Sequence, residues 1–198
     1  MTILSHRQPL VAVFGSSTLR EGEPAYEEAR KLGRALAEQG AAVMTGGYGG
    51  AMAACSRGAH DAGGHVVGVT VELFESRGPA NPWVRERVHT PDLYARLRHL
   101  VHEADGFVAV TGSIGTLTEV FLTWTMVSVD GRPHAPIVLM GRHWHAWLEA
   151  HRAPGMVPEH LFRFVDVADT PDQAARLVVL GIARSRAGRL APAGGGGA

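Results

Sequence analysis

The chain has 198 residues, 45% of them hydrophobic, and its 19 basic residues balance 19 acidic ones. This length and composition predict one domain over residues 1–184, followed by a Gly-, Ala- and Pro-rich tail at 185–198 that we expect to be disordered. Charges of both signs are interspersed, so a nucleic-acid binder is disfavoured and a small neutral or anionic ligand is favoured.

The sequence lacks the features of an exported or membrane-spanning protein. Its longest apolar runs are strand-sized, and no charged segment at the N-terminus precedes an apolar core and a cleavage site. Cys55 is the single cysteine and cannot form an internal disulfide, so we interpret it as a small buried apolar residue. We therefore predict a cytoplasmic protein that contacts no membrane.

Apolar runs alternate with helical patterns, which is typical of a parallel sheet covered by helices on both faces. In chain order we expect a strand at 10–14, a helix at 24–39, a strand at 41–45, a helix at 51–62, a strand at 65–70, a long loop at 72–90, a helix at 91–104, a strand at 106–110, a helix directly after it, a strand at 136–140, a short helix from 143, a strand at 162–167 and a helix at 170–183. The predicted fold class is α/β with a mainly parallel sheet.

Two predicted helices flank the strand at 106–110 and carry apolar stripes. The side chains expected to be buried are Leu93, Leu97, Leu100 and Val101 in the first helix, and Ile114, Leu117, Val120, Phe121 and Trp124 in the second. Thr116, Glu119 and Thr123 share the other face of the second helix, at the spacings that make helix neighbours.

The segment Thr111-Gly-Ser-Ile-Gly-Thr-Leu-Thr-Glu119 joins a predicted strand to a predicted helix. Such a turn points unpaired backbone N–H groups and the positive end of the helix dipole at one spot, which suits a phosphate. Glu119 follows about one turn further in, and an acid beside an anion cradle suits work on a phosphorylated substrate. Its plainer interpretation is a glutamate that complements the helix dipole.

Three glycine- or serine-rich turns, at 15–17, 46–50 and 112–116, follow predicted strands. In an open parallel sheet the carboxyl ends of the strands meet along one crevice, where ligands bind. The turns match neither the dinucleotide-binding pattern nor a P-loop, so hydride transfer and P-loop chemistry are disfavoured. A pyridoxal enzyme is disfavoured as well, because the one lysine, Lys31, lies on a charged helix face.

Four motifs carry a family resemblance through their order and spacing. They are Val13-Phe-Gly-Ser-Ser17 with Pro24-Ala-Tyr26, Thr45-Gly-Gly-Tyr-Gly-Gly-Ala-Met52, Gly63-Gly-His-Val-Val-Gly-Val69 and Gly112-Ser-Ile-Gly-Thr-Leu-Thr-Glu119. Over about residues 10–141 the chain resembles the Lonely Guy (LOG) family. The resemblance implies a Rossmann-like three-layer α/β/α fold, a homodimer, and hydrolysis of the N-glycosidic bond of a nucleoside 5′-monophosphate, cytokinin-type or purine, to free base and ribose 5-phosphate.

Carried over to this sequence, the resemblance implies Glu119 and Arg96 as catalytic residues. The implied substrate- and phosphate-binding residues are Gly15, Ser16, Ser17, Gly46, Gly47, Gly49, Gly50, Met52, Gly112, Ser113, Gly115 and Thr116. The family pattern has proline, glycine, lysine and glycine where this chain has Thr111, Ser113, Leu97 and Thr45. These departures favour altered chemistry. No metal or cofactor is implied.

Rupture of an N-ribosyl bond passes through a cationic state at C1′, which Glu119 would stabilise while it orients or deprotonates the attacking water. Arg96 would anchor the phosphate or ribose, or hold Glu119 charged; its plainer interpretation is a solvent-facing arginine. Asn81 and Trp83 would close over the base, unless Trp83 belongs to a core or an interface. His143 and His145 lack nearby ligand partners, so we expect no metal site.

The leading interpretation is thus an N-glycosidase that needs neither metal nor cofactor. The alternative is a non-catalytic carrier or sensor of a phosphorylated ligand, of the kind represented by molybdenum-cofactor carriers, which share this fold and its glycine motifs. A third possibility, an oligomerising scaffold, predicts no affinity for phosphorylated ligands.

Overall fold

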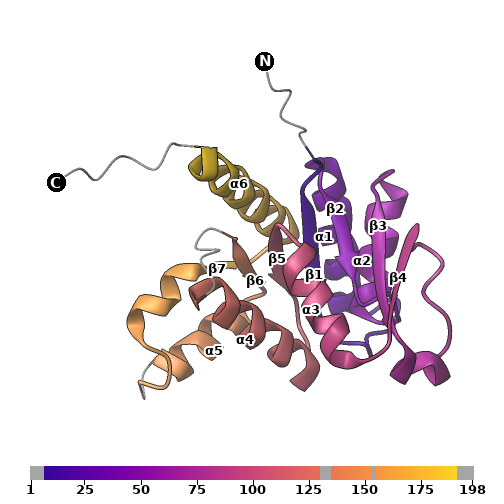
Figure 1. Cartoon of the computed structure of the whole chain (residues 1–198), viewed down its shortest axis with the longest axis horizontal. Helices are drawn as coiled ribbons and strands as arrows, with labels where there is room; N and C mark the ends of the chain where they lie inside the picture. Colours follow the sequence, from indigo (N-terminus) through magenta and orange to yellow (C-terminus); the bar gives the residue numbers. More distant parts are fainter. Residues whose placement is uncertain (1–6, 130–134, 153–154, 191–198) are drawn as a thin grey trace.

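The computed structural model describes residues 7–129, 135–152 and 155–190. Within these ranges, seven strands form one sheet in the order β4-β3-β2-β1-β5-β6-β7, and every neighbouring pair is parallel (Figure 1). The strands are β1 (Leu10–Phe14), β2 (Ala42–Thr45), β3 (Val66–Val71), β4 (Glu86–Thr90), β5 (Gly106–Ala109), β6 (Ile137–Met140) and β7 (Val165–Ala168). The α/β prediction with a mainly parallel sheet is confirmed.

Helices cover both faces of the sheet and form the outer layers (Figure 1). The helices are α1 (Pro24–Glu38), α2 (Ala51–Asp61), α3 (Leu93–Glu103), α4 (Ile114–Val129), α5 (His143–Arg152) and α6 (Pro171–Leu190), with two 3-10 helices, η1 (Glu72–Arg77) and η2 (Glu159–Phe164). Alternate β1 side chains enter opposite cores: Val11 and Val13 pack with α1, α2 and α6, whereas Ala12 and Phe14 pack with α3, α4 and α5.

Close packing of α1 on α2 depends on small residues in both helices. A Cβ atom at Gly33 would overlap the backbone of Cys55, and one at Gly58 would overlap the backbone of Arg30. Cys55 itself is fully buried, as predicted, and burial raises the pKa of its thiol to about 12.

The strand order reverses between β1 and β5. The chain adds β2, β3 and β4 on one side of β1, then crosses over and adds β5, β6 and β7 on the other. Ala12 is paired with Met44 of β2 and with Phe107 of β5, so the three strands end at the same edge of the sheet. This reversal is the switch point at which open α/β sheets bind ligands.

The loop predicted at 72–90 is not wholly irregular: it contains η1 and the edge strand β4. The prediction missed β4 because its sequence, Glu-Arg-Val-His-Thr, is mostly polar. It pairs with β3 alone and leaves its outer edge unpaired, and polar or charged side chains are the usual composition of an edge strand.

Helix α6 extends beyond its predicted end near residue 183 and continues to Leu190, within the segment expected to be a tail. Ser185 is buried, and Arg186 donates a hydrogen bond of 2.9 Å to Asp105 and one of 2.8 Å to the carbonyl of Arg7. These contacts hold the last turns against the sheet. Residues 191–198 lie outside the described residues.

Three burial predictions for α3 and α4 are wrong. Ile114 is 78% exposed, Phe121 is 39% exposed and Leu93 is also exposed, whereas Thr116 and Thr123 of the face opposite to the predicted stripe are buried. Helix α4 carries apolar side chains on all sides, so its periodicity did not identify the face that meets the sheet. None of the helices in the described ranges is long and apolar enough to cross a membrane.

Candidate functional site

A cleft of about 580 Å³ opens at the edge of the sheet where β1, β2 and β5 end. The turn after each of these strands contributes to it, together with α3, the start of α4 and η1. Ten of the residues that the LOG resemblance implies line this cleft: Gly15, Ser17, Gly46, Gly49, Met52, Arg96, Ser113, Gly115, Thr116 and Glu119. The other four, Ser16, Gly47, Gly50 and Gly112, do not line it.

Helix α4 presents its N-terminus to the cleft. The first turn is closed by a hydrogen bond of 3.0 Å from the N–H of Leu117 to the carbonyl of Ser113, so the N–H groups before Leu117 have no acceptor within the helix. Gly112 accommodates the side chain of Thr116, which a Cβ atom at position 112 would overlap, while Gly115 faces open space. Exposed N–H groups at the positive end of a helix suit an anion such as phosphate.

The backbone of Ser16 connects the turns that follow β1, β2 and β5, and Gly50 packs against it. The N–H of Ser16 donates to the carbonyl of Thr111 at 3.0 Å, and the carbonyl of Ser16 accepts from the N–H of Ala51 at 2.8 Å. Gly50 has a φ of 66°, and a Cβ atom there would overlap the carbonyl of Ser16. Glycine is thus required at position 50 for both conformation and space.

Arg96 and Glu119 form a buried charged pair inside the cleft. The Arg96 Nη1 atom lies 3.8 Å from Glu119 Oε1, and the two side chains are only 7% and 14% exposed. Arg96 is oriented by its Nε, which donates to the carbonyl of Val69 at 2.9 Å. Burial raises the pKa of the Glu119 carboxyl from 4.5 to about 7, and the charge of Arg96 opposes this rise only in part.

The structure shows where the two side chains of this pair lie. Arg96 is a buried residue of the cleft and does not face solvent. Glu119 lies in the second turn of α4 and also lines the cleft, where burial raises the pKa of its carboxyl.

Three aromatic residues of the cleft, Phe14, Tyr48 and Phe74, were not predicted as site residues from the sequence. The Tyr48 hydroxyl donates to the carbonyl of Val71 and accepts from its N–H, both at 3.0 Å. The Phe74 ring meets Tyr48 edge to face at 5.9 Å between centroids. Tyr48 stands within a glycine motif and could have been included, whereas Phe74 fell in the segment predicted as a loop and carried no signal.

Asn81 and Trp83 do not line the cleft. The Asn81 side chain donates to the carbonyl of Tyr48 at 3.0 Å, and its backbone N–H donates to the carbonyl of Gly47 at 2.8 Å. The guanidinium of Arg57 lies over the Trp83 ring at 5.4 Å. Asn81 therefore supports the glycine turn after β2, and Trp83 packs against α2.

No group of three or more metal-ligating side chains occurs in the described part of the chain. His145, one of the two histidines considered from the sequence, has its Nε2 3.1 Å from Asp169.

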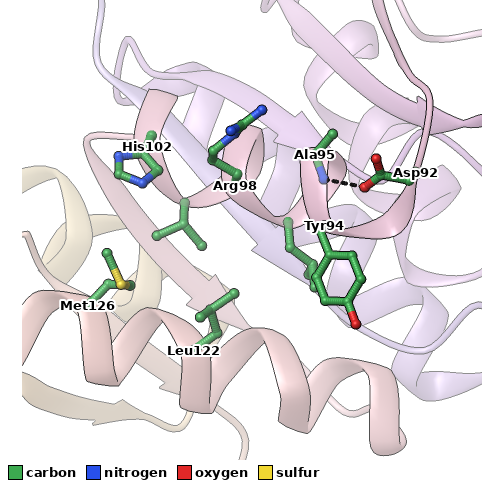
Figure 2. Close-up of a pocket in the computed structure, with 9 residues that line it drawn as sticks. Asp92, Tyr94, Ala95, Arg98, His102, Leu122 and Met126 are labelled. Atoms are coloured by element: carbon green, nitrogen blue, oxygen red, sulfur yellow. Dashed lines mark hydrogen bonds between the residues drawn. The ribbon is translucent and has the colours of Figure 1, made fainter.

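An apolar groove of about 420 Å³ runs between α3 and α4, next to the cleft. Figure 2 shows Asp92 and Tyr94 at one end of the groove, Met126 and His102 at the other, and Leu122 on the α4 side. Leu97 lines both the groove and the cleft, so the two surfaces are continuous.

Comparison with known proteins agrees with this architecture. Residues 8–142 match the model of the SLOG cluster4 family. A cytokinin riboside 5′-monophosphate phosphoribohydrolase of Mycobacterium tuberculosis is 31% identical over 169 residues, which cover 82% of this chain and 89% of that protein. The cytokinin riboside 5′-monophosphate phosphoribohydrolase LOG7 of Arabidopsis thaliana is 31% identical over 128 residues, which cover 62% of this chain and 58% of that protein's length.

A solved structure of the molybdenum cofactor carrier protein of Chlamydomonas reinhardtii aligns with a TM-score of 0.67 at 25% identity, over 89% of this chain and 99% of that one. The match therefore includes the fold of a protein named as a carrier as well as the sequences of proteins named as hydrolases. The family model covers more than half of the chain, and the chain belongs to the SLOG cluster4 family, within the LOG family that its glycine motifs resemble.

Proposed function

We propose that this protein hydrolyses the N-glycosidic bond of a nucleoside 5′-monophosphate. The observation that carries the proposal is the buried carboxylate of Glu119, which lies 3.8 Å from Arg96 in the same cleft as the free N-terminus of α4. The relatives named as phosphoribohydrolases support the same activity. A binding site for phosphate and an acid that titrates near neutral pH are the two components that this reaction needs.

The 5′-phosphate is assigned to the first turn of α4, with the N–H groups at Ile114, Gly115 and Thr116 as donors. Arg96 and Glu119 are assigned to the ribose. Arg96 supplies a planar set of donors for hydroxyl or phosphate oxygens, and Glu119 faces the side on which positive charge develops at C1′.

In the proposed reaction the C1′–N bond breaks and its electron pair leaves on the nitrogen of the base. Water adds its oxygen to C1′, and Glu119 accepts one proton of that water while its negative charge stabilises the cationic transition state. The base takes up one proton and leaves neutral; in the net balance this is the proton that Glu119 received from water, so Glu119 returns to its ionised form. One water molecule is consumed, and the products are the free base and ribose 5-phosphate.

The walls of the cleft suit a flat, apolar base. Phe74, Leu93 and Ile114 line it, and the lining includes no Asn, Gln or Asp side chain that would read the edge of a base by hydrogen bonds. Stacking and dispersion therefore dominate the contact. This environment favours a purine, including a cytokinin-type purine with an apolar substituent.

We further propose that two copies of the chain assemble across the groove between α3 and α4. The groove is apolar at Leu97, Val101 and Leu122, and Asp92 lies at the end opposite to His102, with Arg98 between them (Figure 2). A two-fold axis through the groove would set Asp92 of each copy against the basic end of the other, as an isologous interface requires.

A second candidate function is transport or sensing of a phosphorylated ligand without cleavage. The likeness to the carrier protein favours it, as do Thr111 and Ser113, at which this chain departs from the LOG pattern. Neither residue removes the N–H groups of α4 or the Arg96–Glu119 pair. A carrier would therefore bind its ligand at the same site as the hydrolase but would not cleave it.

The deciding experiment incubates the purified protein with a panel of nucleoside 5′-monophosphates, including N6-isopentenyl-AMP, and measures free base and ribose 5-phosphate. The Glu119→Gln variant is the matched control. Release that depends on Glu119 is the expected result. Nucleotide binding without any release would overturn the hydrolase in favour of the carrier, and the absence of both would overturn the proposed site.

A further inference from the structure

A chain of side-chain contacts leads from the turn after β2 to the charged pair. It passes from Tyr48 to Phe74, from Phe74 to Arg96 and from Arg96 to Glu119. Tyr48 is fixed at its far end by two hydrogen bonds to the backbone of Val71. The proposed function assigns catalytic roles to the last two residues of this chain, whereas Phe74 has so far entered only as part of the cleft wall.

The guanidinium of Arg96 is enclosed on three sides by different parts of the fold. Its Nε donates to the carbonyl of Val69 at 2.9 Å, and its Nη2 lies so close to Gly46 that a Cβ atom there would overlap it. The Phe74 ring covers a further side, with the Arg96 Cζ atom 5.9 Å from the ring centroid. A cation over an aromatic face is attracted by the ring quadrupole, most strongly where water is excluded.

Arginine has a long side chain whose rotamers cost free energy to restrict. The hydrogen bond at Nε fixes the base of the guanidinium, while its outer part lies against the Phe74 ring and the Gly46 backbone. Contact with the ring and with this backbone limits the tilt of the guanidinium plane. Because Nη1 is the atom that approaches Glu119, the tilt of the guanidinium sets the distance between the two charges.

We propose that Phe74 is a positioning residue, whose ring holds the Arg96 guanidinium in place beside Gly46 so that Nη1 stays close to Glu119. The assignment deepens the proposed function, on which its catalytic consequence rests. The position of Arg96 itself is a property of the free protein and can be measured without a substrate.

The primary test follows the Nε–H signal of Arg96 by NMR in nucleotide-free protein, assigned with an Arg96→Lys variant. Phe74→Ala is expected to accelerate exchange of this proton with water at least about 10-fold, because the uncovered guanidinium leaves Val69 more often. Phe74→Tyr, which keeps the ring, is expected to restore the wild-type rate. Phe74→Leu keeps apolar volume for folding and should give an intermediate acceleration.

Leu73→Ala is the matched control, because Leu73 precedes Phe74 in η1, is exposed and does not line the cleft. It is expected to leave the exchange rate of Arg96 within about 2-fold of wild type. Equal rates in Phe74→Leu and the wild-type protein, or the same acceleration in Leu73→Ala, would overturn the positioning role.

A double-mutant cycle then tests the catalytic consequence by turnover of the preferred nucleotide. Phe74→Ala is expected to lower kcat about 10-fold with Arg96 present and less than about 2-fold in an Arg96→Gln background. If the effects of Phe74→Ala and Arg96→Gln on kcat are additive, Phe74 does not act through Arg96 and the positioning role is overturned. Absence of turnover in the wild-type protein would instead reject the proposed function, and the exchange measurement would still decide the role of Phe74.

Discussion

Glu119 is the residue on which the proposed chemistry of the cleft depends. Its carboxyl is 14% exposed and faces one cation at 3.8 Å, a distance too long for a hydrogen bond. Burial therefore outweighs the attraction of Arg96, and the pKa rises to about 7. The group is half ionised at neutral pH and can both accept and return a proton.

Replacement of Glu119 by Gln keeps the shape of the side chain and removes its charge. We expect turnover of the preferred nucleotide to fall at least about 100-fold, because the variant can neither stabilise the cation at C1′ nor accept a proton. Nucleotide affinity should change less than about 3-fold, since the phosphate is held by α4. Calorimetry and a product assay measure the two quantities, and undiminished turnover would remove Glu119 from the mechanism.

The raised pKa of Glu119 also predicts how stability depends on pH. Below pH 4.5 the carboxyl is protonated in both the folded and the unfolded chain. Between pH 4.5 and about 7 only the unfolded chain ionises, so the free energy of unfolding falls across this window and levels off above it. Across this pH window, Glu119 lowers the free energy of unfolding by roughly 3 kcal/mol.

Glu119→Gln stays neutral at every pH and avoids this loss. Urea unfolding at pH 8 is expected to show the variant more stable than wild type by roughly 2–3 kcal/mol, and unfolding at pH 4.5 should show no difference. Equal stabilities at pH 8 would contradict the buried, uncompensated state of the carboxyl.

The same pKa predicts how activity depends on pH. Turnover by the wild-type protein should rise with pH through a midpoint near 7.

At the scale of elements, the N-terminus of α4 is the feature that we propose to orient the substrate. It stands at the strand reversal between β1 and β5, and its first turn carries Ser113, Gly115 and Thr116 on the cleft. A Cβ atom at Gly115 would meet no protein atom within 4 Å, so a side chain at this position would project into open space.

Gly115→Ala separates the effect of residue 115 on helix stability from its effect on ligand affinity. Alanine favours a helix over glycine, so the free energy of unfolding should stay unchanged or rise by up to about 1 kcal/mol. Affinity for nucleotide should fall about 10-fold, because the methyl group enters the space of the phosphate. Gly188→Ala in α6 also meets no protein atom within 4 Å and is the matched control, with the same stability effect and no effect on affinity.

At the scale of the whole molecule, the apolar side chains that α3 and α4 leave exposed form one surface beside the cleft. Tyr94 is exposed at one end of the groove, and Leu93 and Ile114 line the cleft although they are exposed. Exposed apolar surfaces of this kind are typical of interaction sites, and this is where we propose that a second copy binds. A second copy seated on it would also cover the side of the cleft that Leu93, Leu97 and Ile114 border.

Leu122→Arg tests this assembly by placing a charge in the groove. Sedimentation velocity is expected to show a dimer for wild type and a monomer for the variant, because a buried unpaired arginine costs several kcal/mol at an interface. Leu180→Arg on α6 is the matched control, since Leu180 is exposed and lies away from the groove. A wild-type monomer, or a variant that remains dimeric, would contradict the proposed interface.

The sequence by itself determined the layered α/β architecture and most of the cleft. Alternating apolar runs and helical patterns locate six of the strands, and glycine turns after parallel strands must meet at one edge because those strands point the same way. Residues of these turns line the cleft for this reason, whereas Met52, Arg96 and Glu119, which lie in helices, were implied by the family resemblance. Turn chemistry and strand periodicity are local properties, which a sequence records directly.

Only the tertiary structure decided what depends on neighbours distant in the chain. The polar edge strand β4 forms because β3 is there to pair with it, and the buried face of α4 is chosen by its position over the sheet. The raised pKa of Glu119 and the place of Phe74 over Arg96 depend on packing between α3, α4 and η1. Burial and electrostatic coupling arise between elements, so no pattern within one segment can specify them.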